Sequence, residues 1–227
     1  MTAAGDCAGR DASSAAGRDP TAGAGGPAAL IIARAPGDPA ALTGLAPLLD
    51  ADGRAALQAL LVRRAAAWAA AAAPQRASVA LAGAGDVRAL LPPGVTAFAA
   101  DLPAAIARIG RGPLLIARAD CPRLGPEHAA AALADLAAGC GVVFGAALDG
   151  GWYLAGLAEP RPELLTVTED HTGGIGPVVR RARELGAEVG MLRHERVLAT
   201  PEDAAALLAD PLAPEELKRA LDNSEKN

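Results

Sequence analysis

The amino-acid sequence predicts an α/β fold in which a single mixed, mostly parallel sheet carries helices on both faces. The chain has 227 residues, which is long enough for one domain with a large core and too short to need two. Short apolar runs alternate along it with longer helical stretches, a pattern typical of parallel strands joined by helical crossovers. The strand candidates are apolar at consecutive positions, as expected where helices cover both faces of the sheet.

The predicted elements follow one another in a regular order as far as residue 150. Strands are expected at residues 28–35, 78–82, 95–99, 114–119 and 141–146. A loop containing Pro36, Gly37 and Pro39 ends the first strand. The helices expected between the strands cover residues 48–73, 102–109 and 126–138.

Beyond residue 150 the pattern changes. Residues 152–157 predict a short strand that returns through a glycine turn, antiparallel to its neighbours, so the sheet becomes mixed. A helix is expected from about residue 173 to 185 and a further strand at residues 187–192. Thr200 is followed by Pro201 and two acids, which predicts the N-cap and first turn of a terminal helix.

The ends of the chain differ from the predicted domain at residues 28–210. Residues 1–27 are rich in small residues and lack the apolar stretch of a secretory signal, so a disordered N-terminal tail is expected. Residues 211–227 are expected to form a C-terminal helix and tail. The alanine-rich run around Trp68 is only about half a membrane span, so it predicts a soluble helix and no membrane partner.

Charge and cysteine content exclude several classes of partner. The formal net charge of -5 provides no basic stripe for phosphate backbones, so nucleic acid is not an expected partner. The three cysteines show neither the spacing of a zinc site nor a disulfide framework, which favours the reducing cytoplasm. Lysine occurs only at Lys218 and Lys226, so arginine, backbone N–H groups or a metal must meet any anion bound by the domain.

Asp120 is the first candidate functional residue, because it follows the apolar run at residues 114–119. Open α/β sheets hold ligands at the carboxyl ends of such strands, where one carboxylate can bind a divalent cation that bridges phosphates. Asp120 can equally cap a helix after Pro122, and its position alone does not separate the two interpretations. Cys121 invites a role as a nucleophile, but packing is the favoured interpretation.

Asp149 is the second candidate, because Gly150 and Gly151 follow it and allow a backbone to approach a bound group closely. Asp-Gly is also a common hairpin turn, which is the favoured interpretation from the dipeptide alone. Trp152 and Tyr153 come next, and this aromatic pair is expected to wall a pocket.

Weaker signals remain open or are set aside. The glycines at residues 173–176 precede a helix and could present N–H groups to an anion, or could simply form a flexible start of the helix. Gly83 and Gly85 follow a strand, but the third glycine of a dinucleotide fingerprint is missing, so no such site is expected. His128 is expected on a helix surface and His194 at a strand end.

Five motifs occur in a fixed order over about four-fifths of the chain: Ala33-Arg34-Ala35-Pro36, Leu45-Ala46-Pro47, Ala119-Asp120-Cys121-Pro122, Asp149-Gly150-Gly151-Trp152-Tyr153-Leu154 and Thr200-Pro201-Glu202-Asp203. With these motifs the chain resembles the bacterial radical-SAM/selenodomain-associated transferases, a glycosyltransferase-like family with the GT-A nucleotide-diphospho-sugar transferase fold. It is more distantly similar to nucleotidyltransferases such as phospholactate guanylyltransferase.

The resemblance implies a metal-dependent transferase with a nucleotide or nucleotide-sugar donor and a small-molecule acceptor. Asp120 would bind Mg²⁺ or Mn²⁺, and Asp149 would orient or deprotonate the acceptor hydroxyl. The residues implied to contact the substrates are Arg34, Thr43, Gly150, Gly151, Trp152 and Thr172.

This chain departs from the family at several charged positions. The family usually has lysine, threonine and arginine where this chain has Leu42, Thr43 and Gly44, and it usually has aspartate where this chain has Ala199. Of a late tryptophan-serine-threonine motif only Thr172 is retained. Nearby arginines, namely Arg34, Arg118 and Arg123, could replace part of the lost charge. Two hypotheses therefore stand: an active transferase, or a non-catalytic member that keeps the fold as a binding or partner module.

Overall fold

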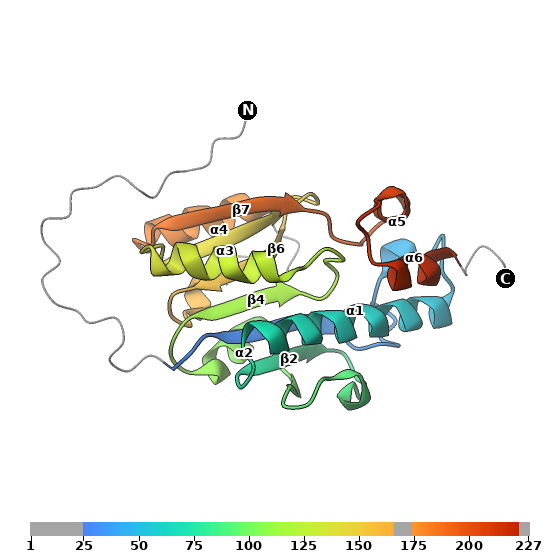
Figure 1. The fold of residues 1–227 in the computed structure, drawn as a ribbon, viewed down its shortest axis with the longest axis horizontal. Helices are drawn as coiled ribbons and strands as arrows, with labels where there is room; N and C mark the ends of the chain where they lie inside the picture. Colours follow the sequence, from blue (N-terminus) through green and yellow to red (C-terminus); the bar gives the residue numbers. More distant parts are fainter. Residues whose placement is uncertain (1–24, 166–173, 223–227) are drawn as a thin grey trace, which may run out of the picture.

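The computed structural model describes residues 25–165 and 174–222, in which seven strands form one sheet in the order β3-β2-β1-β4-β6-β5-β7 (Figure 1). β6 runs antiparallel to β4 and β5, and every other neighbouring pair is parallel. The predicted α/β class and the mixed, mostly parallel sheet are confirmed. The strands are β1 (Ala28–Arg34), β2 (Ala77–Ala82), β3 (Thr96–Ala99), β4 (Leu114–Arg118), β5 (Val142–Ala147), β6 (Trp152–Leu157) and β7 (Val189–Glu195).

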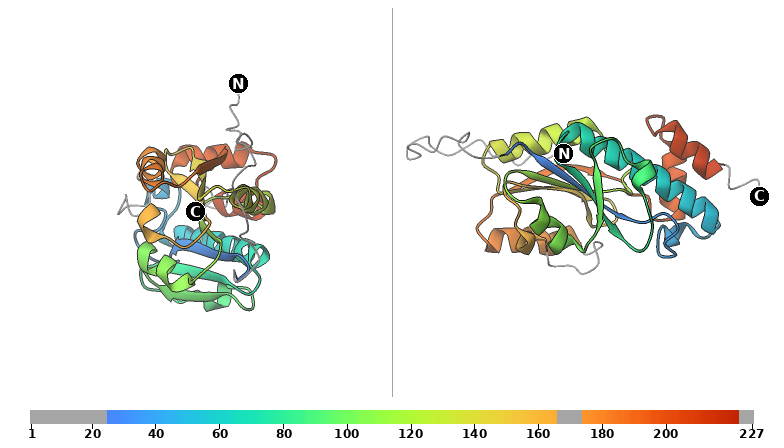
Figure 2. Two further views of the ribbon diagram at one scale, coloured as in Figure 1. Left: turned by 90° about the vertical axis from the view of Figure 1, so that its left-hand side faces the viewer. Right: turned by 90° about the horizontal axis from the view of Figure 1, so that it is seen from below.

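Helices cover both faces of this sheet. α1 (Ala51–Ala72) and α3 (Pro126–Ala137) lie on one face, and α2 (Leu102–Ile109) and α4 (Ile175–Glu184) lie on the other (Figure 2). α5 (Pro201–Ala209) and α6 (Glu215–Asp222) lie beyond the carboxyl ends of the strands, beside the start of α1. Three short 3-10 turns complete the described elements: η1 (Thr43–Leu45), η2 (Arg88–Leu90) and η3 (Pro162–Leu164).

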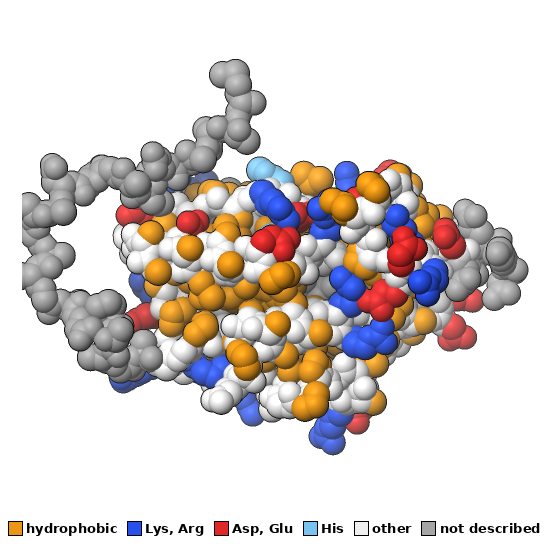
Figure 3. Space-filling view, in the orientation of Figure 1, with side chains coloured by type: hydrophobic (Ala, Val, Ile, Leu, Met, Phe, Trp, Pro, Cys, Tyr) orange, Lys and Arg blue, Asp and Glu red, His pale blue; other side chains and the backbone are white. Residues whose placement is uncertain are grey.

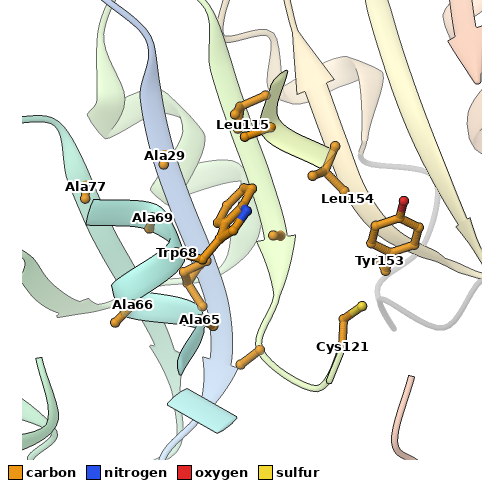
Figure 4. Packing of buried hydrophobic residues seen from close by; sticks show 14 of the residues in the cluster. Ala29, Ala65, Ala66, Trp68, Ala69, Ala77, Leu115, Cys121, Tyr153 and Leu154 are labelled. Atoms are coloured by element: carbon orange, nitrogen blue, oxygen red, sulfur yellow. The ribbon is translucent and has the colours of Figure 1, made fainter. Parts of the chain in front are cut away.

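The apolar strands build two core layers because successive side chains of a strand point to opposite faces. In β1, Ile31 packs in the layer beneath α1 and α3, whereas Leu30 packs in the layer against α2 and α4. Trp68 of α1 lies among small residues such as Ala29 and Ala69 (Figure 4). Its Nε1 donates a hydrogen bond to the Gly125 carbonyl at 2.9 Å, which ties α1 to the start of α3.

The C-terminal helix α6 packs on the same folded body. Leu217 and Leu221 share an apolar cluster with Leu57 and Leu61 of α1. The carboxylate of Glu216 also accepts hydrogen bonds from two arginines of α1, at 2.7 and 2.8 Å. α6 therefore extends the core past the predicted domain boundary at residue 210.

Local signals located the helix starts well. α5 begins at Pro201 with Thr200 as N-cap, as predicted, and Thr200 also forms a reciprocal capping box with Asp203. α1 starts at Ala51, later than the expected residue 48, because the Asp50 side chain accepts a hydrogen bond from the Gly53 N–H at 2.7 Å and caps the helix there. β7 covers residues 189–195 and is both later and longer than the predicted strand. No helix within residues 25–165 and 174–222 is both long and apolar enough to cross a membrane.

Candidate functional site

The candidate site lies where the strand order changes direction. From β1 the chain builds β2 and β3 on one side and then crosses to β4 on the other side of β1. In open α/β sheets the loops that leave the carboxyl ends of such strands separate and form a crevice in which ligands bind. Arg34 ends β1, Asp120 follows β4, and Asp149 follows the parallel strand β5 at the same edge. The structure therefore brings three of the predicted site residues to one edge of the sheet.

At this edge the Arg118 side chain donates hydrogen bonds to the carboxylates of both Asp120 and Asp149. These three residues form the Arg118–Asp120–Asp149 cluster. Arg118 Nε donates to Asp120 Oδ1 at 2.9 Å, and Nη2 donates to Asp120 Oδ2 at 2.6 Å. Its Nη1 donates to Asp149 Oδ2 at 3.1 Å. The Arg118 side chain is 9% exposed, whereas those of Asp120 and Asp149 are 25% and 27% exposed. The carboxylates therefore face solvent and the guanidinium lies beneath them.

The charges of the cluster are coupled. Burial lowers the pKa of Arg118, but the charges and hydrogen bonds of Asp120 and Asp149 raise it by more, so the pKa lies above its ordinary value. One positive charge faces two negative ones, which leaves the cluster one negative charge in excess. A bare diphosphate would be repelled by this cluster, whereas a hydroxyl donor would be attracted.

Asp149 serves both the turn and the cluster. Its Oδ1 accepts a hydrogen bond from the Gly151 N–H at 2.8 Å, and Gly150 adopts a φ of 91°, which favours glycine. The Gly150 carbonyl also accepts a hydrogen bond from the Ile175 N–H at 2.7 Å, where α4 begins. The two interpretations of Asp149 are therefore compatible, because the turn is what holds its carboxylate against Arg118.

Asp120 does not cap a helix. α3 begins at Pro126 after Gly125, and the side chain of Asp120 is directed to Arg118. Its backbone carbonyl accepts a hydrogen bond from the Leu198 N–H at 2.8 Å, which connects the loop after β4 to the segment that precedes α5.

The loop after β1 packs against that same segment. Gly44 lies so close to the Ala199 carbonyl that a Cβ at this position would overlap it. Leu42, just before η1, has a φ of 50°, in the left-handed region. Thr43 is exposed on this loop. The resemblance leads us to expect a cation at the position of Gly44 and an aspartate at the position of Ala199. These two positions are in contact, and in this chain neither residue is charged.

The three arginines considered as replacements differ in how firmly they are held. Arg118 is buried and donates three hydrogen bonds within the cluster. Arg123 donates to Asp210 at 3.1 Å and is about one-third exposed. Arg34 is half exposed, and the distance from its Nη1 to Asp38 Oδ2 is 3.4 Å, which is longer than the distance between Arg123 and Asp210. Exposed pairs of this kind stabilise a protein by about 0–1 kcal/mol, so Arg34 is the arginine most easily released to an incoming anion.

Trp152 and Tyr153 do not form the predicted pocket wall. They are only 1% and 0% exposed, and they pack in the two core layers on opposite faces of the sheet. The reason is that β6 is inserted between β4 and β5, so helices cover both of its faces. The expected contact of the Trp152 side chain with substrate is therefore wrong for this structure. Thr172 lies outside the described residues.

His128 is buried, contrary to the expectation of a helix surface. Its Nδ1 accepts a hydrogen bond from the Gly125 N–H at 3.0 Å, and its Nε2 lies 3.3 Å from Glu195 Oε1. Cys121 lies near this pair and is 4% exposed. Burial, together with the charges of Asp120 and Glu195, raises the pKa of Cys121 to about 12. The structure therefore fits a packing role of Cys121 better than a role as a nucleophile.

The glycines after β2 have a structural task. A Cβ on Gly83 would overlap the Asp38 side chain, and one on Gly85 would lie 2.8 Å from the Ala35 Cβ. Both glycines allow the loop after β2 to approach the loop after β1.

The cluster fits a resident divalent cation poorly. Mg²⁺ and Mn²⁺ favour several oxygen ligands around one point. Here both oxygens of Asp120 and one of Asp149 already accept hydrogen bonds from a positively charged guanidinium. Residues 25–165 and 174–222 contain no group of three or more His, Cys, Asp or Glu side chains that could hold a metal ion. The expected Mg²⁺ or Mn²⁺ stays a prediction.

The described part of the chain includes two cavities of different character. The first has a volume of about 210 Å³ and is lined in part by Pro122, Arg123, Leu148 and Glu195, so its wall includes neighbours of both Asp120 and Asp149. The second, about 750 Å³, is an apolar groove between α1 and α3 and lies apart from the cluster. Figure 3 shows apolar side chains gathered along this face.

The strand order and the helices on both faces define an α/β fold with one mixed, mostly parallel sheet. The chain is similar to a protein from Desulfovibrio desulfuricans G20 described as a "putative nucleotide-diphospho-sugar transferase", with a TM-score of 0.70 and 20% identity over 87% of this chain and 96% of the other. Rv0371c from Mycobacterium tuberculosis H37Rv is similar with a TM-score of 0.50 and 18% identity over 82% of this chain and 100% of the other.

The chain belongs to the family described as "uncharacterized protein conserved in bacteria (DUF2064)", whose model matches residues 54–169. None of the curated proteins compared with it matches. The matched segment contains Arg118, Asp120 and Asp149, so the cluster lies within the part of the chain that the family model matches. The narrower link to radical-SAM/selenodomain-associated proteins stays a prediction.

Proposed function

We propose that this protein is a transferase that uses a nucleotide-activated donor, in the manner of a glycosyl- or nucleotidyltransferase. The observation that carries the proposal is the Arg118–Asp120–Asp149 cluster at the edge where the strand order changes direction. The transferase-like fold and the family add support.

The donor and the acceptor would lie on different sides of this edge. The excess negative charge of the cluster disfavours a diphosphate directly on Asp120 and Asp149. The loop after β1 is the better place for the donor, because Arg34 is loosely paired and Thr43 offers an exposed hydroxyl. The acceptor would lie against Asp149, Gly150 and Gly151, close to the 210 Å³ cavity.

Asp149 is the group proposed to act on the acceptor. Its two oxygens are held by the Gly151 N–H and by Arg118, which fixes the plane of the carboxylate. The exposed part of this carboxylate can accept the proton of an acceptor hydroxyl as that oxygen bonds to the transferred group, while the bond between that group and the donor's phosphate or diphosphate breaks and this anion leaves. Arg118 would position Asp120 and Asp149 relative to each other. No step in this proposal passes through a metal ion.

A non-catalytic binding module is the second candidate, and one observation favours it. Each of the three arginines near the strand ends is paired with a carboxylate, and the first loop carries no cation. A donor diphosphate would therefore meet less positive charge than the chemistry of a charged leaving group usually requires. Such a protein would bind a nucleotide without consuming it.

Thermal-shift titration with nucleoside diphosphates, triphosphates and sugar nucleotides, with and without Mn²⁺, tests the proposal. Wild type, Asp120→Asn and Asp149→Asn would be compared with Glu184→Gln, which makes the same change of charge at a remote, exposed position of α4. We expect a concentration-dependent rise in melting temperature for wild type and the control, and a rise at least as large for Asp120→Asn, because that change removes a negative charge close to the donor.

Turnover separates the two candidates. Chromatography of the ligands that bind should show consumption of the donor by wild type and a loss of that consumption in Asp149→Asn. A shift without consumption would favour the binding module. No shift with any of these ligands would contradict both candidates.

A further inference from the structure

Arg118 makes the same contacts that a shared cation would make with Asp120 and Asp149. Each oxygen of Asp120 accepts one of its N–H groups, at 2.9 and 2.6 Å, so this pair is bidentate. Asp149 completes the arrangement with one oxygen on Arg118 at 3.1 Å and the other on the Gly151 N–H at 2.8 Å. All four carboxylate oxygens therefore have a hydrogen-bond donor.

The guanidinium is built into the sheet and is not a mobile surface group. Arg118 is the last residue of β4, a strand whose five residues are all buried. It pairs in register with Ile32 of β1, and the Ala119 N–H donates to the Ile32 carbonyl at 3.1 Å. Buried charges persist in proteins where they are paired and hydrogen bonded, as this one is. Its position is thus defined by the backbone of the two central strands.

A divalent cation between these carboxylates would have to lie within a few ångströms of the guanidinium charge. Coulomb repulsion between them is strong in a partly buried site, and the metal would also have to displace hydrogen bonds that already satisfy the oxygens. The carboxylates alone would carry two negative charges and attract such a cation. Arg118 removes half of that attraction and occupies the shared space.

We infer that Arg118 replaces the divalent cation that the two carboxylates would otherwise share, so that the resting protein takes up no Mg²⁺ or Mn²⁺ between Asp120 and Asp149. The inference concerns the same site as the proposed function and takes from it only the functional importance of these carboxylates. The positive charge between the two carboxylates is then supplied by the Arg118 side chain of the protein itself. Ligand binding would then depend little on the concentration of free metal.

Mn²⁺ titration followed by electron paramagnetic resonance tests this, because the signal of free Mn²⁺ falls when the ion binds. The proteins compared are wild type, Asp120→Asn, Arg118→Met, the double variant Arg118→Met/Asp120→Asn and the control Arg161→Met. The control removes the same charge from a remote pair with a single carboxylate, Glu163. We expect wild type and the control to leave Mn²⁺ free. Arg118→Met should bind one ion at least about tenfold more tightly than wild type, and the added Asp120→Asn change should abolish that binding.

Two results would overturn the inference: uptake of one Mn²⁺ by wild type that is lost in Asp120→Asn, or no uptake by a folded Arg118→Met protein. Far-UV circular dichroism reports whether Arg118→Met is folded. If it is not, the comparison of wild type with Asp120→Asn decides the question alone. No nucleotide is present, so a failure of nucleotide binding would contradict the proposed function and leave this result unaffected.

Discussion

Gly145 and Tyr153 provide the sharpest test of how β6 is packed. A Cβ on Gly145 would lie 2.6 Å from Cε1 and 2.8 Å from the hydroxyl oxygen of Tyr153, whereas ordinary contacts of a Cβ begin near 3.4 Å. The ring atom Cζ would lie closer still, so the ring would have to move by roughly 1 Å. It has little freedom to do so, because Tyr153 is fully buried, donates to the Arg193 carbonyl at 3.1 Å and packs edge-on against His128.

Gly145→Ala should therefore lower the free energy of unfolding by about 2–3 kcal/mol, the cost of overpacking a rigid core. Tyr153→Leu removes the ring and is destabilising by itself, by about 2–4 kcal/mol. In that background Gly145→Ala should cost almost nothing or stabilise by about 0.5 kcal/mol, because Gly145 is not among the residues with positive φ.

Urea denaturation followed by far-UV circular dichroism measures all four proteins of this cycle. We expect a coupling energy of about 2 kcal/mol or more between the two positions. The two effects adding to within about 0.5 kcal/mol would refute the argument, since it would show that the ring of Tyr153 does not lie against Gly145.

Three further predictions concern single positions. Burial raises the pKa of Asp203, but hydrogen bonds from Arg196, Ala199 and Thr200 lower it by more, so the pKa lies below the ordinary value of 3.8. Asp203→Asn should therefore lower the free energy of unfolding by about 1 kcal/mol at pH 7. In urea unfolding this difference between the two proteins should shrink as the pH falls below 3.8, because the carboxylate stabilises the fold only while it is ionised. A difference that does not change with pH would contradict this explanation. Cys121, with its pKa of about 12, should react with iodoacetamide at about pH 8 only after unfolding, and peptide mass spectrometry of native protein labelled at the unfolded rate would contradict its burial. Arg34→Met should weaken the binding of a nucleotide diphosphate about tenfold in calorimetry while changing the free energy of unfolding by less than about 1 kcal/mol, and unchanged affinity would remove Arg34 from the proposed donor site.

Much of the fold could be predicted because its signals are local. The apolar runs of β1 and β4 are nearly continuous, and the helix at residues 102–109 was predicted with the bounds that the structure has. Asp101 and Thr200 cap their helices with side chains that reach only three residues along the chain. The edge of the sheet that holds Asp120 could also be predicted, since carboxyl ends of parallel strands share an edge.

The contacts of the site could not be predicted in the same way. From the sequence, Arg118 was only one of three arginines that could replace part of the lost positive charge. A charged residue at the end of a buried apolar strand is nevertheless a signal that a carboxylate lies nearby to pair with it. Its two partners are 2 and 31 residues away in the chain, and the second reaches it only through the placement of the β5–β6 turn. His128 has a comparable distant partner in Glu195, 67 residues away.

The sequence by itself determined the class of the fold, the order of its elements and the carboxylates at the strand ends, because these follow from the spacing of apolar residues and from side chains that act on their own backbone. Only the tertiary structure decided that β6 enters the middle of the sheet, that Trp152 and Tyr153 are buried, and that Arg118 joins Asp120 to Asp149. These features depend on which strands become neighbours, and hydrogen-bonded pairing of strands distant in the chain leaves little trace in the residues of either strand.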